Sequence, residues 1–146
     1  MSRVFFVDRD LGKAFPAALA AAGIEVRPYC AVFARDDVLD EIWLAHCGRQ
    51  GWIALTHDRS IGLRRRSPAA FPEVFASGVG LIILMGHRKT SDLADAFICS
   101  RTKVEAFLDR HPPPFIAKFY SSPGAPEGEK RGPGRIEMIV SGSTRR

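Results

Sequence analysis

The chain has 146 residues, a length that suits one domain with a hydrophobic core of its own. Hydrophobic residues make up 46% and charged residues 25% of the chain, which excludes a disordered, collagen-like or coiled-coil protein. The longest apolar stretches, such as Val79–Met85, are too short to cross a bilayer, and Val4–Val7 is too short for the core of a signal peptide. We therefore expect a cytoplasmic protein whose three scattered cysteines are reduced thiols.

Basic residues outnumber acidic ones, 21 to 16, which gives a formal net charge of +5. Arg59 and Arg64–Arg66 form a basic cluster, and the chain ends in Arg145 and Arg146. A nucleic-acid partner fits this charge pattern, but so does a solvated loop. The charge alone does not choose between the two.

The first 110 residues alternate between patterns typical of strands and of helices. Short apolar runs predict buried strands, and apolar residues at helical spacing predict helices. In chain order we predict a strand at Arg3–Asp8, a helix at Leu11–Ala22, a strand at Ile24–Tyr29, a loop at Ala31–Asp37, a helix at Val38–Arg49, a strand at Trp52–Thr56, the basic stretch Arg59–Arg66, a short helix near Ala69–Ser77, a strand at Gly80–Met85 and a helix from a cap at Ser91 to about Leu108.

The last third of the chain has a different pattern. Three successive prolines, Pro112–Pro114, exclude a helix. Strands are predicted at Phe115–Tyr120 and Arg135–Val140, joined by the Gly- and Pro-rich loop Ser121–Gly134. These two strands predict a hairpin that follows the alternating core.

Strands that alternate with helices imply a parallel sheet with helices on its faces, and we expect the first four strands in the order 2-1-3-4. The sequence therefore predicts a small three-layer α/β/α protein with a mostly parallel sheet and a C-terminal β-hairpin. We expect a single domain over residues 1–146, with an α/β core at 1–110, the hairpin at 111–140 and a basic tail at 141–146.

Acidic residues follow the predicted strands at one edge of this sheet, where ligands bind if the strand order reverses there. Asp8 ends the first strand and Asp58 follows the third. Since neighbouring strands lie about 4.8 Å apart, the two carboxylates could share one cation. A third acid is expected near the start of the second helix, where Asp40 is favoured because it lies on a largely apolar helical face. The other candidates there are Asp36, Asp37 and Glu41.

Three convergent carboxylates repel one another unless a proton or a metal ion neutralises them. Hard oxygen ligands suit Mg²⁺ or Mn²⁺, and such a site can activate water to cleave a phosphodiester. Acidic residues are also common in loops and at helix starts, where the helix dipole favours them. The spacing alone therefore leaves a metal-free interpretation open.

Residues beside this edge are candidates for contacts with a substrate. Thr56 shares a strand face with Asp58, so its hydroxyl can bond a ligand carboxylate, a phosphate or the loop backbone. His57 points the opposite way and is not expected to be catalytic. The remaining candidates are basic: Arg9, Arg59, Arg64, Arg65 and Arg66.

Several segments, taken in order, resemble one known family. They are Val4–Gly12, Phe15-Pro16 with Leu19 and Gly23, Asp40–Leu44 followed by Gly48, Gly51–Asp58, His111–Tyr120 and Gly134–Glu137. In their order and spacing these segments resemble the PIN-like ribonuclease domains, in particular the VapC-type toxins of toxin–antitoxin systems. The resemblance covers nearly the whole chain.

The resemblance implies a PIN-like fold and a Mg²⁺- or Mn²⁺-dependent endoribonuclease that acts as a toxin. Its partners would be RNA, a cognate antitoxin protein and, in a homodimer, a second copy of the chain, with no membrane partner. It places catalytic, metal-binding acids at Asp8, Asp40 and Asp58. Typical members carry a fourth acid, for which Asp10, Asp92 and Asp95 are candidates, and Glu41 is a further acid nearby.

Two other functions are compatible with the same residues. A PIN-like domain with weak or lost catalysis would bind RNA or an antitoxin, and its RNA affinity would survive the loss of Asp8 and of metal. A receiver domain of a signalling system would use Asp58 as the phosphoryl acceptor. Against a receiver domain, Lys118 precedes Phe119 where such domains have a proline.

Overall fold

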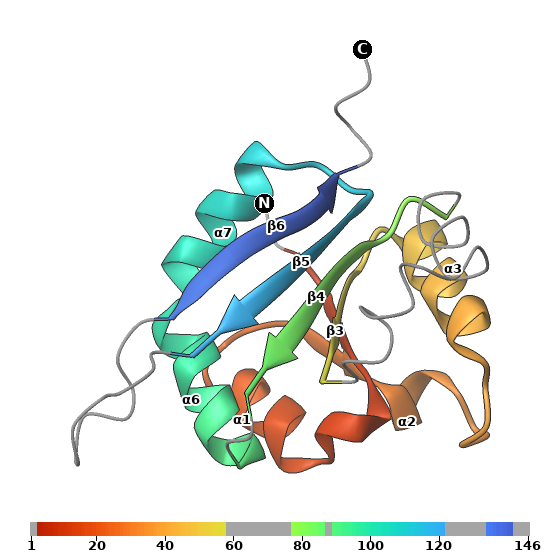
Figure 1. The fold of residues 1–146 in the computed structure, drawn as a ribbon. Helices are drawn as coiled ribbons and strands as arrows, with labels where there is room; N and C mark the ends of the chain where they lie inside the picture. The colour runs from red at the N-terminus through yellow and green to blue at the C-terminus, as the bar shows by residue number, and fades with distance from the viewer. Residues whose placement is uncertain (1–2, 58–76, 87–88, 122–133, 142–146) are drawn as a thin grey trace.

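The computed structural model describes residues 3–57, 77–86, 89–121 and 134–141. These residues form a six-stranded sheet with the strand order β2-β1-β3-β4-β5-β6 (Figure 1). The strands are β1 (Phe5–Val7), β2 (Val26–Pro28), β3 (Ile53–Thr56), β4 (Gly80–Met85), β5 (Phe115–Tyr120) and β6 (Arg135–Ser141). The predicted order of the first four strands is confirmed.

All neighbouring strands from β2 to β5 are parallel, and β5 and β6 are antiparallel. β1 is central to the first half of the sheet, since Phe6 lies between Arg27 of β2 and Ala54 of β3. The mostly parallel sheet with an antiparallel C-terminal pair is thus confirmed.

Helices cover both faces of the sheet, so the three-layer prediction is confirmed as well (Figure 1). One face carries α1 (Ala14–Ala21), α6 (Thr90–Cys99) and α7 (Arg101–Arg110), and the other carries α2 (Tyr29–Val32) and α3 (Asp40–Gln50).

Side chains that alternate along β1 show why both layers form. Phe5 packs edge-on against Phe97 of α6, with 5.7 Å between ring centroids. Phe6 points to the other face, where it stacks on Trp43 of α3 at 5.2 Å. Both side chains are buried, and successive strand residues face opposite sides of a sheet. An uninterrupted apolar run therefore fixes β1 as a strand covered on both faces.

The segment after β2 differs from the prediction. Tyr29 begins the short helix α2, whereas the sequence predicts the end of a strand followed by a loop. The Tyr29 hydroxyl donates a hydrogen bond to the Arg35 carbonyl at 2.6 Å and accepts one from the Val38 N–H at 3.2 Å. This buried phenol organises residues 29–38, a tertiary effect that local periodicity does not contain.

The helix predicted from Ser91 to about Leu108 is two helices, α6 and α7, that meet at Ser100. The Ser100 hydroxyl accepts a hydrogen bond from the Gly134 N–H at 2.7 Å, so the break is tied to the start of β6. The predicted cap at Ser91 is also wrong, because α6 begins at Thr90 and Lys89 precedes it without a side-chain cap.

Some predictions fall outside the described residues. These are the basic stretch 59–66, the helix near Ala69–Ser77 except for Ser77, the interior of the loop between β5 and β6, and the tail from residue 142 onward. The extent of the single domain also stays a prediction. Within the described part, no helix is long and apolar enough to span a membrane.

Candidate functional site

Neighbouring strands bring polar residues together at their carboxyl ends. Asp8 follows β1, Thr56 is the last residue of β3, and Gly86 follows β4. Because β3 lies between β1 and β4, these positions are neighbours in space. We call Asp8, Asp10, Thr56 and His57 the acid edge. Strand order reverses here, between β1 and β3, which is where ligands bind in open parallel sheets.

Asp8 is buried at the acid edge, with 5% of its surface exposed. Its Oδ1 accepts a hydrogen bond from the Arg9 N–H at 2.7 Å, and its Oδ2 accepts one from the Thr56 hydroxyl at 2.8 Å. The first bond caps the 3₁₀ turn η1 (Arg9–Leu11), so the local turn orients the carboxylate. The second bond ties the end of β1 to the end of β3.

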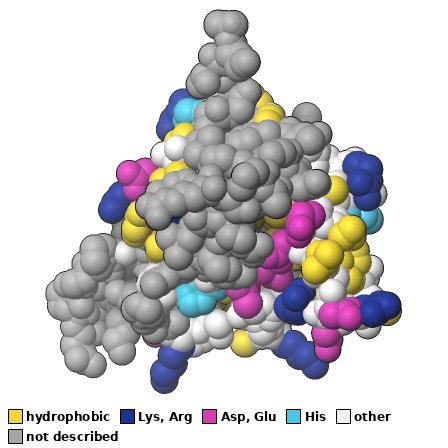
Figure 2. Space-filling model, turned by 45° about the vertical axis from the view of Figure 1, so that its right-hand side comes forward, with side chains coloured by type: hydrophobic (Ala, Val, Ile, Leu, Met, Phe, Trp, Pro, Cys, Tyr) yellow, Lys and Arg dark blue, Asp and Glu magenta, His cyan; other side chains and the backbone are white. Residues whose placement is uncertain are grey.

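Asp10 lies within the same turn and reaches the same hydroxyl. Its Oδ2 is 3.3 Å from Thr56 Oγ1, and its Oδ1 accepts a hydrogen bond from the His57 N–H at 3.3 Å. A hydroxyl carries one hydrogen, so Thr56 donates to one carboxylate at a time, and the shorter distance favours Asp8. Two carboxylates thus converge on one threonine. Figure 2 shows acidic side chains gathered on one face of the molecule.

This placement raises the pKa of Asp8 from 3.8 to about 6. Burial is the main cause, and the negative charge of Asp10 adds to it. The hydrogen bonds from Thr56 and from the Arg9 backbone act in the opposite direction, as does the positive charge of Arg9. Ionisation of Asp8 therefore costs free energy in this pair unless a cation is bound nearby.

A hard divalent cation fits this donor set, since carboxylate oxygens are its preferred ligands. Asp8 and Asp10 would supply them, and Thr56 would orient Asp8. Among the described residues no three acidic, histidine or cysteine side chains converge closely enough to hold a metal ion. The described part of the acid edge thus provides two carboxylates.

Other predicted acids that the structure describes lie on α3 and α6. Asp40 begins α3 and accepts a hydrogen bond from the Trp43 indole N–H at 3.1 Å, one helical turn on. It does not complete a group of three with the acid pair in the described structure. Glu41 is half-buried in α3, and Asp92 and Asp95 are half-buried in α6. A ligand role for any of them stays a prediction.

The predicted third-strand acid, Asp58, lies outside the described residues, as do four of the five predicted basic contacts: Arg59, Arg64, Arg65 and Arg66. The fifth, Arg9, is exposed, and its guanidinium lies 4.7 Å from the centre of the Tyr29 ring, a cation–π contact. His57 Nε2 is 2.8 Å from the Gly86 carbonyl oxygen, so this imidazole joins β3 to the end of β4.

A cavity of about 580 Å³ opens from the acid edge, and the sequence did not indicate it. We call it the α1–β2 cavity. Asp8 and Arg9 line one part of it, and its walls come from α1, β2 and α2. Ala17 and Ala20 of α1 line it, and their small, exposed side chains leave space beside β2. The sequence alone marks these alanines only as helical residues.

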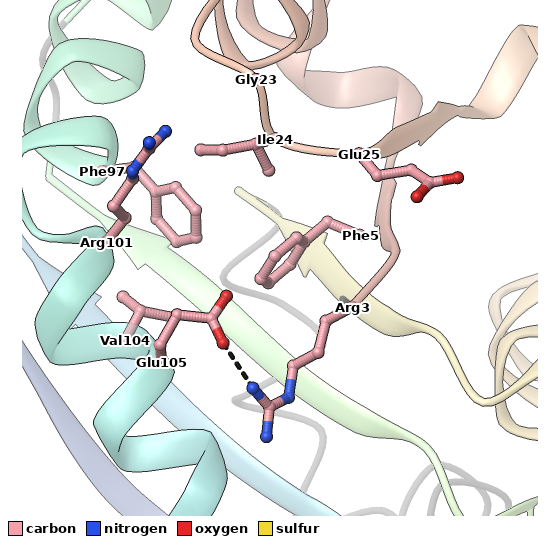
Figure 3. Close-up of a pocket in the computed structure, with 9 residues that line it drawn as sticks. All are labelled: Arg3, Phe5, Gly23, Ile24, Glu25, Phe97, Arg101, Val104 and Glu105. Carbon is pink, nitrogen blue, oxygen red and sulfur yellow. Dashed lines mark hydrogen bonds and ion pairs between the residues drawn. The ribbon is translucent and has the colours of Figure 1, made fainter. Parts of the chain in front are cut away.

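A second cavity, of about 290 Å³, lies at the opposite end of β1 (Figure 3). Phe5 and Ile24 line it, together with residues of α6 and α7. Its charged groups are satisfied locally, since Arg3 pairs with Glu105 and with Asp109, and the Arg101 guanidinium donates to the Ala22 carbonyl. We therefore assign it to the scaffold.

The fold and the paired carboxylates define an α/β protein with an acidic site at the carboxyl edge of a parallel sheet. The comparison with protein families matches residues 3–86, more than half of the chain, to the PIN like domain. The chain therefore belongs to the PIN-like domain family. Neither the comparison with curated proteins nor that with solved structures gives a match. The predicted PIN-like fold is confirmed. The family match is to PIN-like domains and not to the receiver domains considered as an alternative.

Proposed function

We propose that the protein is a metal-dependent endoribonuclease. The observation that carries the proposal is the convergence of Asp8 and Asp10 on the Thr56 hydroxyl at the point of strand reversal. Membership of the PIN-like family supports it, because nuclease activity is ascribed to this family. A basic chain with a net charge of +5 suits a polyanionic substrate.

The chain's own residues would have distinct roles. Asp8 and Asp10 hold the cation, and Asp40 and Asp58 are the proposed further ligands. Thr56 keeps the Asp8 carboxylate in place. When bound, Mg²⁺ or Mn²⁺ supplies a Lewis acid that activates water and stabilises charge on the phosphodiester.

Contacts with the strand are assigned to basic residues. Arg9 lies between Asp8 and Asp10 in the sequence. Arg59 and Arg64–Arg66 are the other proposed phosphate contacts. Contacts to phosphates hold an RNA strand regardless of its sequence.

The direct test is cleavage of mixed cellular RNA by purified protein with Mg²⁺, with Mn²⁺ and with EDTA. The wild type is compared with an Asp8→Asn/Asp58→Asn double variant. Asp109→Asn is the control, because it makes the same kind of substitution at an exposed position at the other end of β1, on α7. Cleavage that requires metal, persists in the control and disappears in the double variant is expected.

Cleavage that persists in the double variant would remove these acids from the mechanism. Absence of cleavage by folded, metal-loaded protein would favour the second candidate, a PIN-like module that binds RNA or an antitoxin.

We further propose that the nuclease is a toxin acting on cytoplasmic RNA, with an antitoxin partner. The resemblance to VapC-type toxins supports this role. Leu39 and Ile42, at the start of α3, are 64% and 55% exposed, and such apolar side chains suit a protein partner or a second copy of the chain. Induced expression should arrest growth, and Asp8→Asn should relieve the arrest. Arrest that is unchanged in the variant would separate toxicity from the acid edge.

A further inference from the structure

The α1–β2 cavity begins at the acid edge, so whatever occupies it lies next to the proposed reaction centre. Asp8 lines both. At about 580 Å³ it is within the range of small-molecule sites. Its position makes it the natural place for the part of the substrate beside the reacting phosphate.

The walls of the cavity are mostly apolar. Pro16, Ala17 and Ala20 of α1 form one wall, and Val26 and Pro28 of β2 form the other. Such surfaces accept the flat, weakly hydrated face of an unstacked base. Single-stranded RNA is commonly recognised through bases that are splayed out in this way.

Charged groups also line the cavity. Arg9 and Lys13 line the cavity and are exposed, so both can contact phosphate. Arg9 is held against the Tyr29 ring, with 4.7 Å between the guanidinium and the ring centre. A planar guanidinium is also a surface on which a base can stack.

Asp36 adds a hydrogen-bond acceptor to the cavity. It is exposed and lines the same cavity. The Tyr29 hydroxyl is already engaged by Arg35 and Val38. Carboxylates accept hydrogen bonds from base amines, such as N4 of cytosine, whereas uracil has no exocyclic amine.

We propose that the α1–β2 cavity is a nucleobase subsite that takes the base next to the reacting phosphate, and that Asp36 favours a base with an exocyclic amine over uracil. This proposal rests on the proposed ribonuclease function and deepens it by naming a substrate preference.

Occupation of the cavity can be measured through the reactivity of a cysteine that lines it. Cys30 lines it and is exposed, Cys99 on α6 is exposed elsewhere, and Cys47 is buried. The rate of maleimide labelling at each thiol is followed by peptide mass spectrometry, with cytidine 5′-monophosphate or uridine 5′-monophosphate and Mg²⁺. A mononucleotide has no internucleotide bond to be cleaved. With the cytidine nucleotide at about ten times its Kd, labelling of Cys30 should slow about tenfold while Cys99 is unaffected.

Matched variants test the location. Ala17→Leu fills the cavity from an exposed helix position and should raise the concentration for half-protection about tenfold, equivalent to roughly 1.4 kcal/mol of binding. Ala21→Leu makes the same change on the same helix at an exposed residue outside the cavity lining and should leave protection unchanged. Asp36→Asn should reduce the preference for cytidine over uridine nucleotide.

The outcomes separate this proposal from the nuclease itself. Absence of Cys30 protection in a protein that cleaves RNA would overturn the subsite and leave the nuclease standing, and would favour a protein segment as the occupant. Equal protection by both nucleotides would overturn the role of Asp36. Protection without any metal-dependent cleavage would keep the base site and overturn the nuclease.

Discussion

The Thr56 hydroxyl donates a 2.8 Å hydrogen bond to the buried carboxylate of Asp8, which is 48 positions away in the chain. This bond joins the carboxyl ends of β1 and β3 at the point where the strand order reverses. Asp10 lies on the other side of the same hydroxyl. The acid edge is therefore built by the sheet topology together with one short turn.

Thr56→Val should destabilise the protein, because it removes the hydroxyl and keeps the shape. Hydrogen bonds to charged groups are worth about 1.5–3 kcal/mol, and Thr56 and Asp8 are both buried. A loss of this size is expected in urea denaturation at neutral pH, with Thr56→Ser retaining most of the stability. A valine variant as stable as the wild type would show that the bond does not hold the acid edge together.

The metal-free protein should lose stability through Asp8 as the pH rises from about 4 to about 6. The pKa of this carboxyl is about 6 in the folded state, against 3.8 for an unperturbed aspartate, so the folded state holds the proton more tightly. Protonation therefore stabilises the fold, and the ionised carboxylate at pH 7 costs up to about 3 kcal/mol.

Asp8→Asn removes this dependence. Denaturation in EDTA at about pH 4.5 and about pH 7.5 should show the variant gaining stability relative to the wild type at the higher pH, by about 2 kcal/mol. The difference between the two proteins cancels the titration of groups that do not interact with Asp8. A gap that does not change with pH would mean that Asp8 titrates normally.

Gly48→Ala should destabilise the protein, although alanine is the better helix former by about 1 kcal/mol. Gly48 lies within α3, and a Cβ there would come within 2.7 Å of the Ser77 carbonyl carbon, just before β4. Because that contact is with backbone, we expect a loss of about 2–3 kcal/mol in thermal or urea denaturation. A gain in stability would show that α3 and Ser77 are further apart.

The sheet could be predicted from the sequence because its signal is local. Val4–Val7 is apolar without interruption, which marks a strand covered on both faces, and the alternation of strands with helices limits the topology. Asp8 and Thr56 could be placed at one edge from strand ends alone. Their hydrogen bond follows from that placement.

The remaining details depend on contacts between distant residues. Ser100 interrupts a continuous helical pattern where its hydroxyl meets the Gly134 N–H, and no periodicity records that partner. Asp10 joins the site because a 3₁₀ turn folds it back toward Thr56. The α1–β2 cavity exists because exposed alanines of α1 leave a gap beside β2, which becomes visible only when the layers are assembled.

Binding of Mn²⁺, followed by electron paramagnetic resonance, tests the central claim most directly, because the signal of the free ion falls on binding. The wild type and the Asp109→Asn control should bind Mn²⁺ alike, and Mg²⁺ should compete. Asp8→Asn and Asp10→Asn should each weaken binding, by about tenfold or more. Equal binding by the wild type and both acid-edge variants would contradict the account, because the cation would then lie elsewhere.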